Sequence, residues 1–522
     1  MAIPQRITSR SAGRLIAGMF CALLLAGAQS QAQELDYDEP WIMPFDIDQH
    51  FPDDPPPLVS QQSQVYDFMW RTFVALNWLQ LDGGARAEPD PSQDLAPWDD
   101  ADQSQGPVVW QSYLRPNEVF VKPKEWPLFW NDPPVTPQPV CPPAPLLEPS
   151  IVNSFSTNYS DNSDGLNQPF IQANYATGPV IDQNGNYLRY EVGLNQAYFT
   201  YIGHFRYYDA RRQKFAVERY IDFVKENGVA PDPSNSRHAK YFQPLPNGTE
   251  AYLQNLPDYA LQGMVEWKAA WKILGGDDVP ERFYRRFVYF LNPDGSCTGP
   301  FLAGLVALHI HRVTRSLGHI GTTFEQVDNT QLQPDYSAAQ VAGAAALPPH
   351  ASLNPGGEVS PIYPNGYEVC DSDGNNCESG KAGILPELVK DGETLPLDPP
   401  ITNVVRQAPI PDDVQETNAA WREKLAGSVF FYYQMIGAQN ANIDEPNPNL
   451  GPGVRGAQVS STNQLINTAL ESYTQRGWSC ALCHQNASPL GVSLPLPPFQ
   501  EEYDALHTIS FLLQNAQRNG KY

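Results

Sequence analysis

The sequence predicts a mixed α+β protein, with a loop-rich body and a helical C-terminal segment. Apolar residues recur with helical spacing in some stretches and alternate or run continuously in others, as expected for helices and strands. The 522 residues include 51 prolines and 37 glycines, which indicates many loops rather than a compact helical bundle. Hydrophobic residues make up 41% of the chain, enough to bury a large core and to exclude wholesale disorder.

The first 32 residues have the pattern of a secretion signal. Arg6, Arg10 and Arg14 form a basic region, residues 15–28 an apolar run, and residues 30–32 a small-x-small cleavage site. The apolar run is too short for a membrane-spanning helix, and no later run is longer. We therefore expect an exported, periplasmic protein that is soluble after cleavage and has no membrane span.

Residues 33–330 are predicted to form the mixed α+β body. An acidic, Pro-rich arm over residues 33–62 precedes a helix over residues 63–78 that is apolar nearly all round, as in a buried helix. The other expected elements are a hairpin over 180–192 with Asn184-Gly185 at its turn, helices over 214–227 and 263–273, strands over 282–291 and 301–313, and a strand and turn over 322–329.

The remainder divides into a Pro/Gly-rich excursion over residues 331–415 and a helical segment over residues 416–522. In the second part, helical spacing predicts helices over residues 416–436, 462–475 and 501–517.

The sequence Cys480-Ala481-Leu482-Cys483-His484 has the C-x-x-C-H spacing of a covalent haem c site. Two thiols three residues apart fall on one side of a helical turn, where both reach the haem vinyl groups, and the adjacent imidazole reaches the iron. We expect one haem, linked to Cys480 and Cys483, with His484 as the proximal iron ligand. Two alternatives fit this motif less well. A zinc site requires further ligands, and only His507 follows the motif. A redox dithiol normally follows a buried strand, whereas a helix is expected before this motif.

The other cysteines fit an oxidising compartment. Of seven in the chain, one lies in the signal and two in the haem motif. Four thiols remain, which favours two disulfides. Proximity predicts Cys370–Cys377 and leaves Cys141–Cys297 as the long-range bridge, although other pairings and free thiols stay open. Asp371, Asp373 and Asn375 in the loop alternate like calcium ligands, but the glycine spacing of an EF-hand is absent, so a solvated turn is favoured.

The ligand on the distal side of the haem iron must come from another part of the chain. Only 38 residues follow His484, and none is methionine. His309 is the first candidate for the distal side, because a neutral imidazole in an apolar run needs a partner. A core histidine hydrogen-bonded to the backbone is the alternative.

Other side chains are weaker candidates near the iron. On a strand, His311 shares the face of His309, and Arg312 is a candidate partner of a haem propionate. The remaining iron-ligand candidates are His507, Met435 and Met264. An HxH metal site completed by Glu325 or Asp328 is a further alternative.

The charge balance limits the class of partner. The formal charge is −25, and removing the three signal arginines makes it −28. Such a field disfavours nucleic acid and anionic membranes and favours a basic redox partner protein, although it also serves solubility.

Several stretches together resemble a known protein family. They are residues 72–78, 182–191, 265–271, 308–310, 323–329 and 479–484. These resemble a largely uncharacterised family of exported bacterial cytochrome-c-like proteins, over most of the mature chain. The resemblance implies a haem at Cys480, Cys483 and His484 on a shared body, and it implies no substrate.

These observations favour one-electron transfer through a haem in the periplasm. Two alternatives remain open: a haem-dependent oxidoreductase of peroxidase or oxidase type with a pocket in the large body, and a haem-based sensor. The chain has no G-x-S-x-G, H-E-x-x-H, P-loop or dinucleotide fingerprint that would indicate another chemistry.

Overall fold

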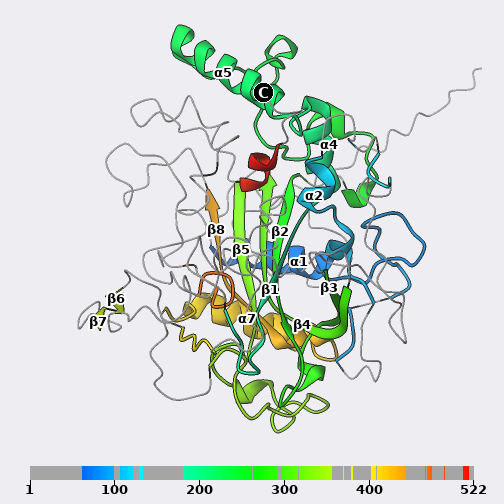
Figure 1. Cartoon of the computed structure of the whole chain (residues 1–522), viewed down its shortest axis with the longest axis vertical. Coiled ribbons are helices and arrows are strands. Elements are labelled where there is room, and N and C mark those ends of the chain that lie inside the picture. Colours follow the sequence, from blue (N-terminus) through cyan, green and yellow to red (C-terminus); the bar gives the residue numbers. More distant parts are fainter. Residues whose placement is uncertain are drawn as a thin grey trace, which may run out of the picture. The chain divides into compact units, whose positions relative to one another are not determined.

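The computed structural model divides into two compact units, Met1–Asp46 and Ile47–Tyr522. The residues that it describes all belong to the second unit (Figure 1). They are 62–93, 95–98, 106–121, 126, 129–132, 180–260, 263–291, 297–315, 317–354, 368–369, 378–379, 401–406, 408–441, 465, 467–472, 487, 489 and 510–516.

An antiparallel sheet organises this unit. Its strand order is β1-β2-β4-β5-β8, and β3 also pairs with β4 (Figure 1). The strands are β1 (Arg189–Leu194), β2 (Val265–Ile273), β3 (Arg285–Leu291), β4 (Cys297–Thr314), β5 (Gly318–Gln326) and β8 (Tyr433–Ala441). Together with the helices, this sheet confirms the predicted α+β class.

Strand β4 is the central and longest strand, with 18 residues. Its residues 303–310 are all buried, which explains the near-continuous apolar run in its sequence. It pairs with β2, β3 and β5, so side chains from each of these strands lie beside those of β4.

Helices α1 (Gln62–Leu76) and α7 (Asp412–Lys424) pack against one face of the sheet. From α1, Phe73 stacks on Phe324 of β5 with ring centroids 4.1 Å apart. Trp70 stacks on Trp421 of α7 at 5.7 Å. Large aromatic surfaces are therefore buried between these two helices and this face of the sheet.

Helices α4 (Gln196–Phe205) and α5 (Ala210–Asn227) follow β1. The side chains of Asn195 and Asp209 cap their first turns, and α5 ends at Gly228 with φ +66°. The shorter helical elements are η1 (Val109–Ser112), α2 (Pro116–Val119), η4 (Ser236–His238), η5 (Ala251–Leu253), η6 (Asp258–Ala260), η7 (Pro280–Arg282), η8 (Pro334–Tyr336), η9 (Val429–Tyr432) and η12 (Phe511–Asn515).

Several predicted elements are confirmed. Helix α1 is almost wholly buried, helix α5 covers residues 214–227, and β3, β4 and β5 lie where strands were expected. The Asn184-Gly185 turn is present, with Gly185 at φ +78° and an Ile181–Tyr187 bridge beside it. The strand that leaves this turn is β1, which pairs with β2 rather than back on residues 180–182.

The helix predicted over residues 263–273 is wrong, because this segment is strand β2. Its Glu, Lys and Ala residues favour a helix, but Trp267 and Trp271 are buried on the apolar side of the sheet and both contact Trp110. Pairing with β1 and β4 on both sides therefore overrides the local preference.

The helix predicted over residues 416–436 is also wrong in its second half. Helix α7 ends at Lys424, Gly427 takes a left-handed φ of +98°, and the chain continues as η9 and then β8. In the helix expected over residues 462–475, the described residues 467–472 form a turn, and in the helix expected over residues 501–517, the described residues form the 3-10 helix η12. Prediction failed here because a short apolar run fits helical spacing and strand alternation equally well.

Candidate functional site

Three histidines lie on the face of the sheet opposite α1 and α7. His309 and His311 of β4 and His319 of β5 all point to this side, which also carries Glu266, Lys268, Thr323 and Glu325; we call it the histidine face. Register explains the grouping, because Glu266 lies opposite His311, and Lys268 and Thr323 flank His309. The three imidazoles are between 3% and 8% exposed, so their polar atoms need partners within the protein.

The prediction that His309 and His311 share a face is confirmed. Their ring centroids are 6.2 Å apart. His311 Nδ1 lies 3.0 Å from His319 Nε2, which is a hydrogen bond between two imidazoles. Since one of these two nitrogens must donate and the other accept, the pair holds one proton between the rings.

His309 has a different partner. Its Nε2 lies 2.5 Å from Oε1 of Glu471, a residue of the turn formed by residues 467–472, which we call the C-terminal turn. Burial would raise the pKa of the Glu471 carboxyl, but His309, Lys268 and the backbone N–H of Asn467 together hold this pKa below its ordinary value. Glu471 is thus a carboxylate that accepts hydrogen bonds.

Further contacts hold the C-terminal turn on the sheet. The Asn467 amide donates to Thr323 Oγ1 at 2.7 Å, and the Thr468 N–H donates to Glu325 Oε1 at 2.5 Å. Ala469 and Leu470 enter an apolar cluster that includes Tyr190 of β1 and Ala307 of β4, and the Tyr190 hydroxyl donates to the Ala469 carbonyl. The turn is therefore fixed to the sheet by both polar and apolar contacts.

The chain returns to the same face at η12. Ser510 donates from Oγ to Glu266 Oε2 at 2.5 Å and accepts from the Tyr198 hydroxyl at 2.8 Å. Gln213 of α5 donates to the Leu513 carbonyl at 2.9 Å. Residues 467–472 and 510–513, which lie before and after the predicted haem motif in sequence, thus both contact the histidine-bearing sheet or the helices beside it.

Glu266 is the most perturbed carboxyl of the histidine face. Burial raises its pKa to about 8, although the Ser510 hydrogen bond acts in the opposite direction. At neutral pH Glu266 is therefore mostly protonated.

The HxH metal site considered from the sequence lacks its carboxylates. Glu325 is ion-paired with Arg406 and accepts from Thr468, and Asp328 is ion-paired with Arg282 at 2.6 Å. Within the described residues no group of three or more His, Cys, Asp or Glu side chains is arranged to hold a metal ion. These two carboxylates instead pair with arginine side chains.

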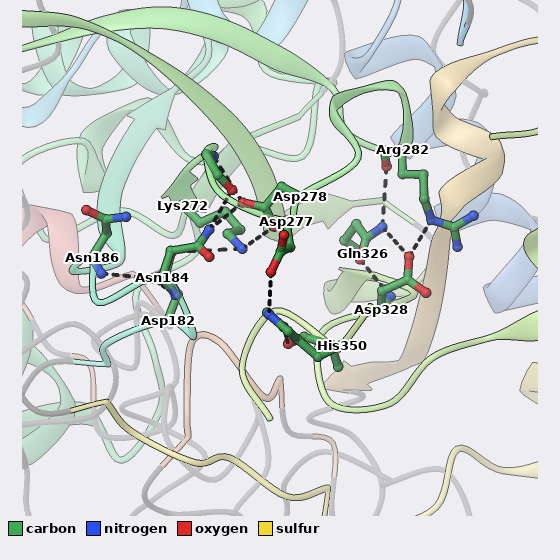
Figure 2. A network of polar contacts seen from close by, with 12 residues as sticks. Asp182, Asn184, Asn186, Lys272, Asp277, Asp278, Arg282, Gln326, Asp328 and His350 are labelled. Atoms are coloured by element: carbon green, nitrogen blue, oxygen red, sulfur yellow. Dashed lines mark hydrogen bonds and ion pairs between the residues drawn. The ribbon is translucent and has the colours of Figure 1, made fainter. Parts of the chain in front are cut away.

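Figure 2 shows the network that contains Asp328, together with a second buried cation, Lys272. Lys272 Nζ lies 2.6 Å from Asp278 and 3.9 Å from Asp182. Burial raises the pKa of Asp182 to about 6, although Lys272 acts in the opposite direction. These contacts tie the Asn184-Gly185 turn to the end of β2, and their role is structural.

Two of the weaker candidates point away from the histidine face. Arg312 donates to Thr72 of α1 and lies over the Phe68 ring at 4.7 Å, so it is buried on the helix-covered side. Met435 lies opposite Phe324 in the β5–β8 pairing, on that same side. The propionate contact proposed for Arg312 therefore does not fit the face on which His309 lies. Met264 is buried directly before β2, where its carbonyl accepts from Val313.

Several predicted features lie outside the described residues. These are the signal, Cys480, Cys483, His484, His507, the calcium candidates Asp371, Asp373 and Asn375, and the side chains of the cysteines in both predicted disulfides. The short strands β6 (Glu368–Val369) and β7 (Glu378–Ser379) pair with each other directly outside Cys370 and Cys377.

Sequence reasoning missed His319, Glu266 and Glu471. The alternation of Gly318-His319-Ile320 was a usable signal, because it places His319 on one side of a strand. Glu266 was hidden by the incorrect helix, and the pairing of Glu471 with His309 joins positions 162 residues apart, which local patterns do not encode.

No helix among the described residues is both long and apolar enough to cross a membrane. Comparison of the chain with protein-family models, with curated proteins and with solved structures gave no match.

Proposed function

We propose that this chain is an exported, periplasmic monohaem protein that transfers one electron. The haem c is linked to Cys480 and Cys483, with His484 as proximal iron ligand and His309 on the distal side. Bound in this way, the haem supplies a one-electron couple whose potential depends on its axial ligands and its burial.

The observation that carries the proposal is the position of the chain on either side of the motif. The C-terminal turn lies on the histidine face, and Ser510 returns to Glu266 on that face. Ser472 precedes Cys480 by eight residues, which reach at most about 29 Å when fully extended. This short tether supports a motif that lies close enough to the histidine face for one of its imidazoles to meet the iron.

The donor set of the face also fits a haem iron. His309 is 5% exposed, and its Nδ1 is buried without a hydrogen-bond partner among the described residues. An orphaned imidazole nitrogen is costly unless a ligand or a proton donor satisfies it. Iron with two strong axial ligands transfers electrons and does not readily bind substrate, which favours electron transfer over catalysis on the haem.

The charge of the chain supports a class of redox partner. With 58 acidic and 33 basic residues, the protein attracts a basic protein and speeds its encounter at low ionic strength. The partner that we propose is therefore a basic redox protein.

Expression with the haem c maturation machinery tests the proposal. After denaturing electrophoresis, the wild-type chain is expected to retain a haem-dependent peroxidase stain. A Cys480→Ala, Cys483→Ala variant is expected to lose it, whereas Cys141→Ala, which removes a thiol outside the motif, keeps it. Absence of the stain from the wild-type chain would refute covalent haem and with it the proposed function.

A further inference from the structure

His309 and Glu471 form a pair that determines which imidazole nitrogen is available. Nε2 of His309 lies 2.5 Å from Oε1 of Glu471. Its other nitrogen, Nδ1, is buried and makes no hydrogen bond among the described residues. The two nitrogens of one ring thus have opposite environments.

Glu471 acts as an acceptor in this pair. Its Oε2 accepts the Asn467 N–H at 2.9 Å, so the second oxygen is also used as an acceptor. Lys268 lies opposite His309 in the β2–β4 register, so a cation stands beside the pair. Because a glutamic acid is a stronger acid than an imidazolium, the shared proton belongs to Nε2 of His309.

We propose that Glu471 is a positioning residue that fixes His309 as the Nε2–H tautomer and so leaves Nδ1 as the iron-binding nitrogen. The inference rests on the proposed function, because it assigns an atom and a supporting residue to the distal side of the same haem. Metal-ligating histidines usually donate their other N–H to a carboxylate or carbonyl, which fixes the tautomer and raises the basicity of the ligand. Glu471 holds the corresponding place on His309.

The neighbouring imidazoles provide a contrast within the same face. Nδ1 of His311, the atom equivalent to the proposed ligand, is engaged by His319 at 3.0 Å. His311 is therefore the matched control for His309.

The test compares the ferric visible and electron paramagnetic resonance spectra of the holoprotein and its variants, each first checked for haem by denaturing stain. The wild type is expected to be low-spin. His309→Ala is expected to become high-spin and to return to low-spin when imidazole is added, which also shows that its fold is intact. His311→Ala is expected to stay low-spin.

Substitutions of Glu471 separate positioning from simple packing. Removal of an outer-shell partner weakens a metal–ligand bond by about 10- to 100-fold, so Glu471→Ala is expected to show a high-spin fraction and CO binding that the wild type lacks. In Glu471→Gln the side-chain carbonyl still accepts from Nε2, so low-spin iron returns, with a more positive reduction potential because the anion is gone. Glu423→Gln, on the exposed surface of α7, controls for the lost charge and is expected to match the wild type.

Three results would overturn the inference. They are a low-spin spectrum in His309→Ala, a Glu471→Ala protein that matches the wild type in spectrum and CO binding, and a Glu471→Gln protein that behaves as Glu471→Ala. In each case a positive haem stain leaves the covalent haem and its one-electron role standing, and low-spin iron in His309→Ala removes His309 alone from the distal side. A wild-type chain without the stain instead refutes both.

Discussion

Replacing Glu266 by glutamine is expected to make the folded chain progressively more stable than the wild type as the pH rises from 5 to 8. Glu266 is 6% exposed, and burial raises the pKa of its carboxyl from 4.5 to about 8. The folded chain holds this proton up to about pH 8, whereas the unfolded chain releases it near pH 4.5. Unfolding therefore releases a proton between these values, and wild-type stability falls as pH rises.

The size of the effect follows from the pKa difference. Each pH unit within the window changes the free energy of unfolding by about 1.4 kcal/mol, so Glu266 costs the wild type roughly 4 kcal/mol between pH 5 and pH 8. Glutamine has nearly the same shape, accepts the Ser510 hydrogen bond through its carbonyl and does not titrate. The variant therefore does not lose stability in this way as the pH rises. The difference in the free energy of unfolding between variant and wild type levels off above pH 8.

Urea unfolding followed by fluorescence of the 11 tryptophans at pH 5, 6.5 and 8 measures this difference. The midpoint of Glu266→Gln relative to wild type is expected to rise at each step, with an unchanged slope of the transition. Glu226→Gln, an exposed site near the end of α5, removes the same charge and is expected to show no such trend. A pH-independent difference between Glu266→Gln and wild type would refute a protonated, buried Glu266.

Three further substitutions test the packing around the sheet. In the wild type Lys272 lies 2.6 Å from Asp278, so Lys272→Met leaves this carboxylate buried without its cation. The substitution is expected to lower the free energy of unfolding, measured in urea, by about 3–5 kcal/mol. An unchanged unfolding midpoint would contradict the buried network. At Gly437 an added Cβ lies 2.8 Å from Leu465 Cδ1, so the larger side chain of Gly437→Val is expected to displace Leu465 and to speed limited proteolysis near residues 465–472, and wild-type cleavage kinetics would argue against it. Burial raises the pKa of Asp67 from 3.8 to about 6, so the stability of Asp67→Asn relative to wild type is expected to grow by up to about 3 kcal/mol between pH 4 and pH 6; a flat difference would contradict this.

The sequence correctly predicted those elements in which the pattern of apolar residues matches the burial of the element in the fold. Helix α1 is apolar nearly all round because it is buried between the sheet and α7, and β4 is a continuous apolar run because neighbouring strands and packed elements cover it. Alternation along β4 likewise placed His309 and His311 on one face. In these segments local pattern and tertiary environment require the same residues.

Prediction failed where the local sequence pattern and the tertiary environment favour different structures, and where residues distant in sequence come into contact. The segment that forms β2 carries good helix formers, but Trp267 and Trp271 find their partners only in the sheet. The pairing of His309 with Glu471 depends on how the C-terminal turn returns to the sheet. Such contacts between distant residues follow from the completed fold and leave no local periodic signal.

We propose that one haem c lies beside the histidine face with both axial positions of its iron filled. The visible spectrum of the purified, reduced holoprotein, recorded with and without carbon monoxide, tests this most directly. We expect a low-spin c-type spectrum that carbon monoxide does not change. A high-spin spectrum that shifts when the gas is added would mean an open iron and would contradict distal ligation by His309.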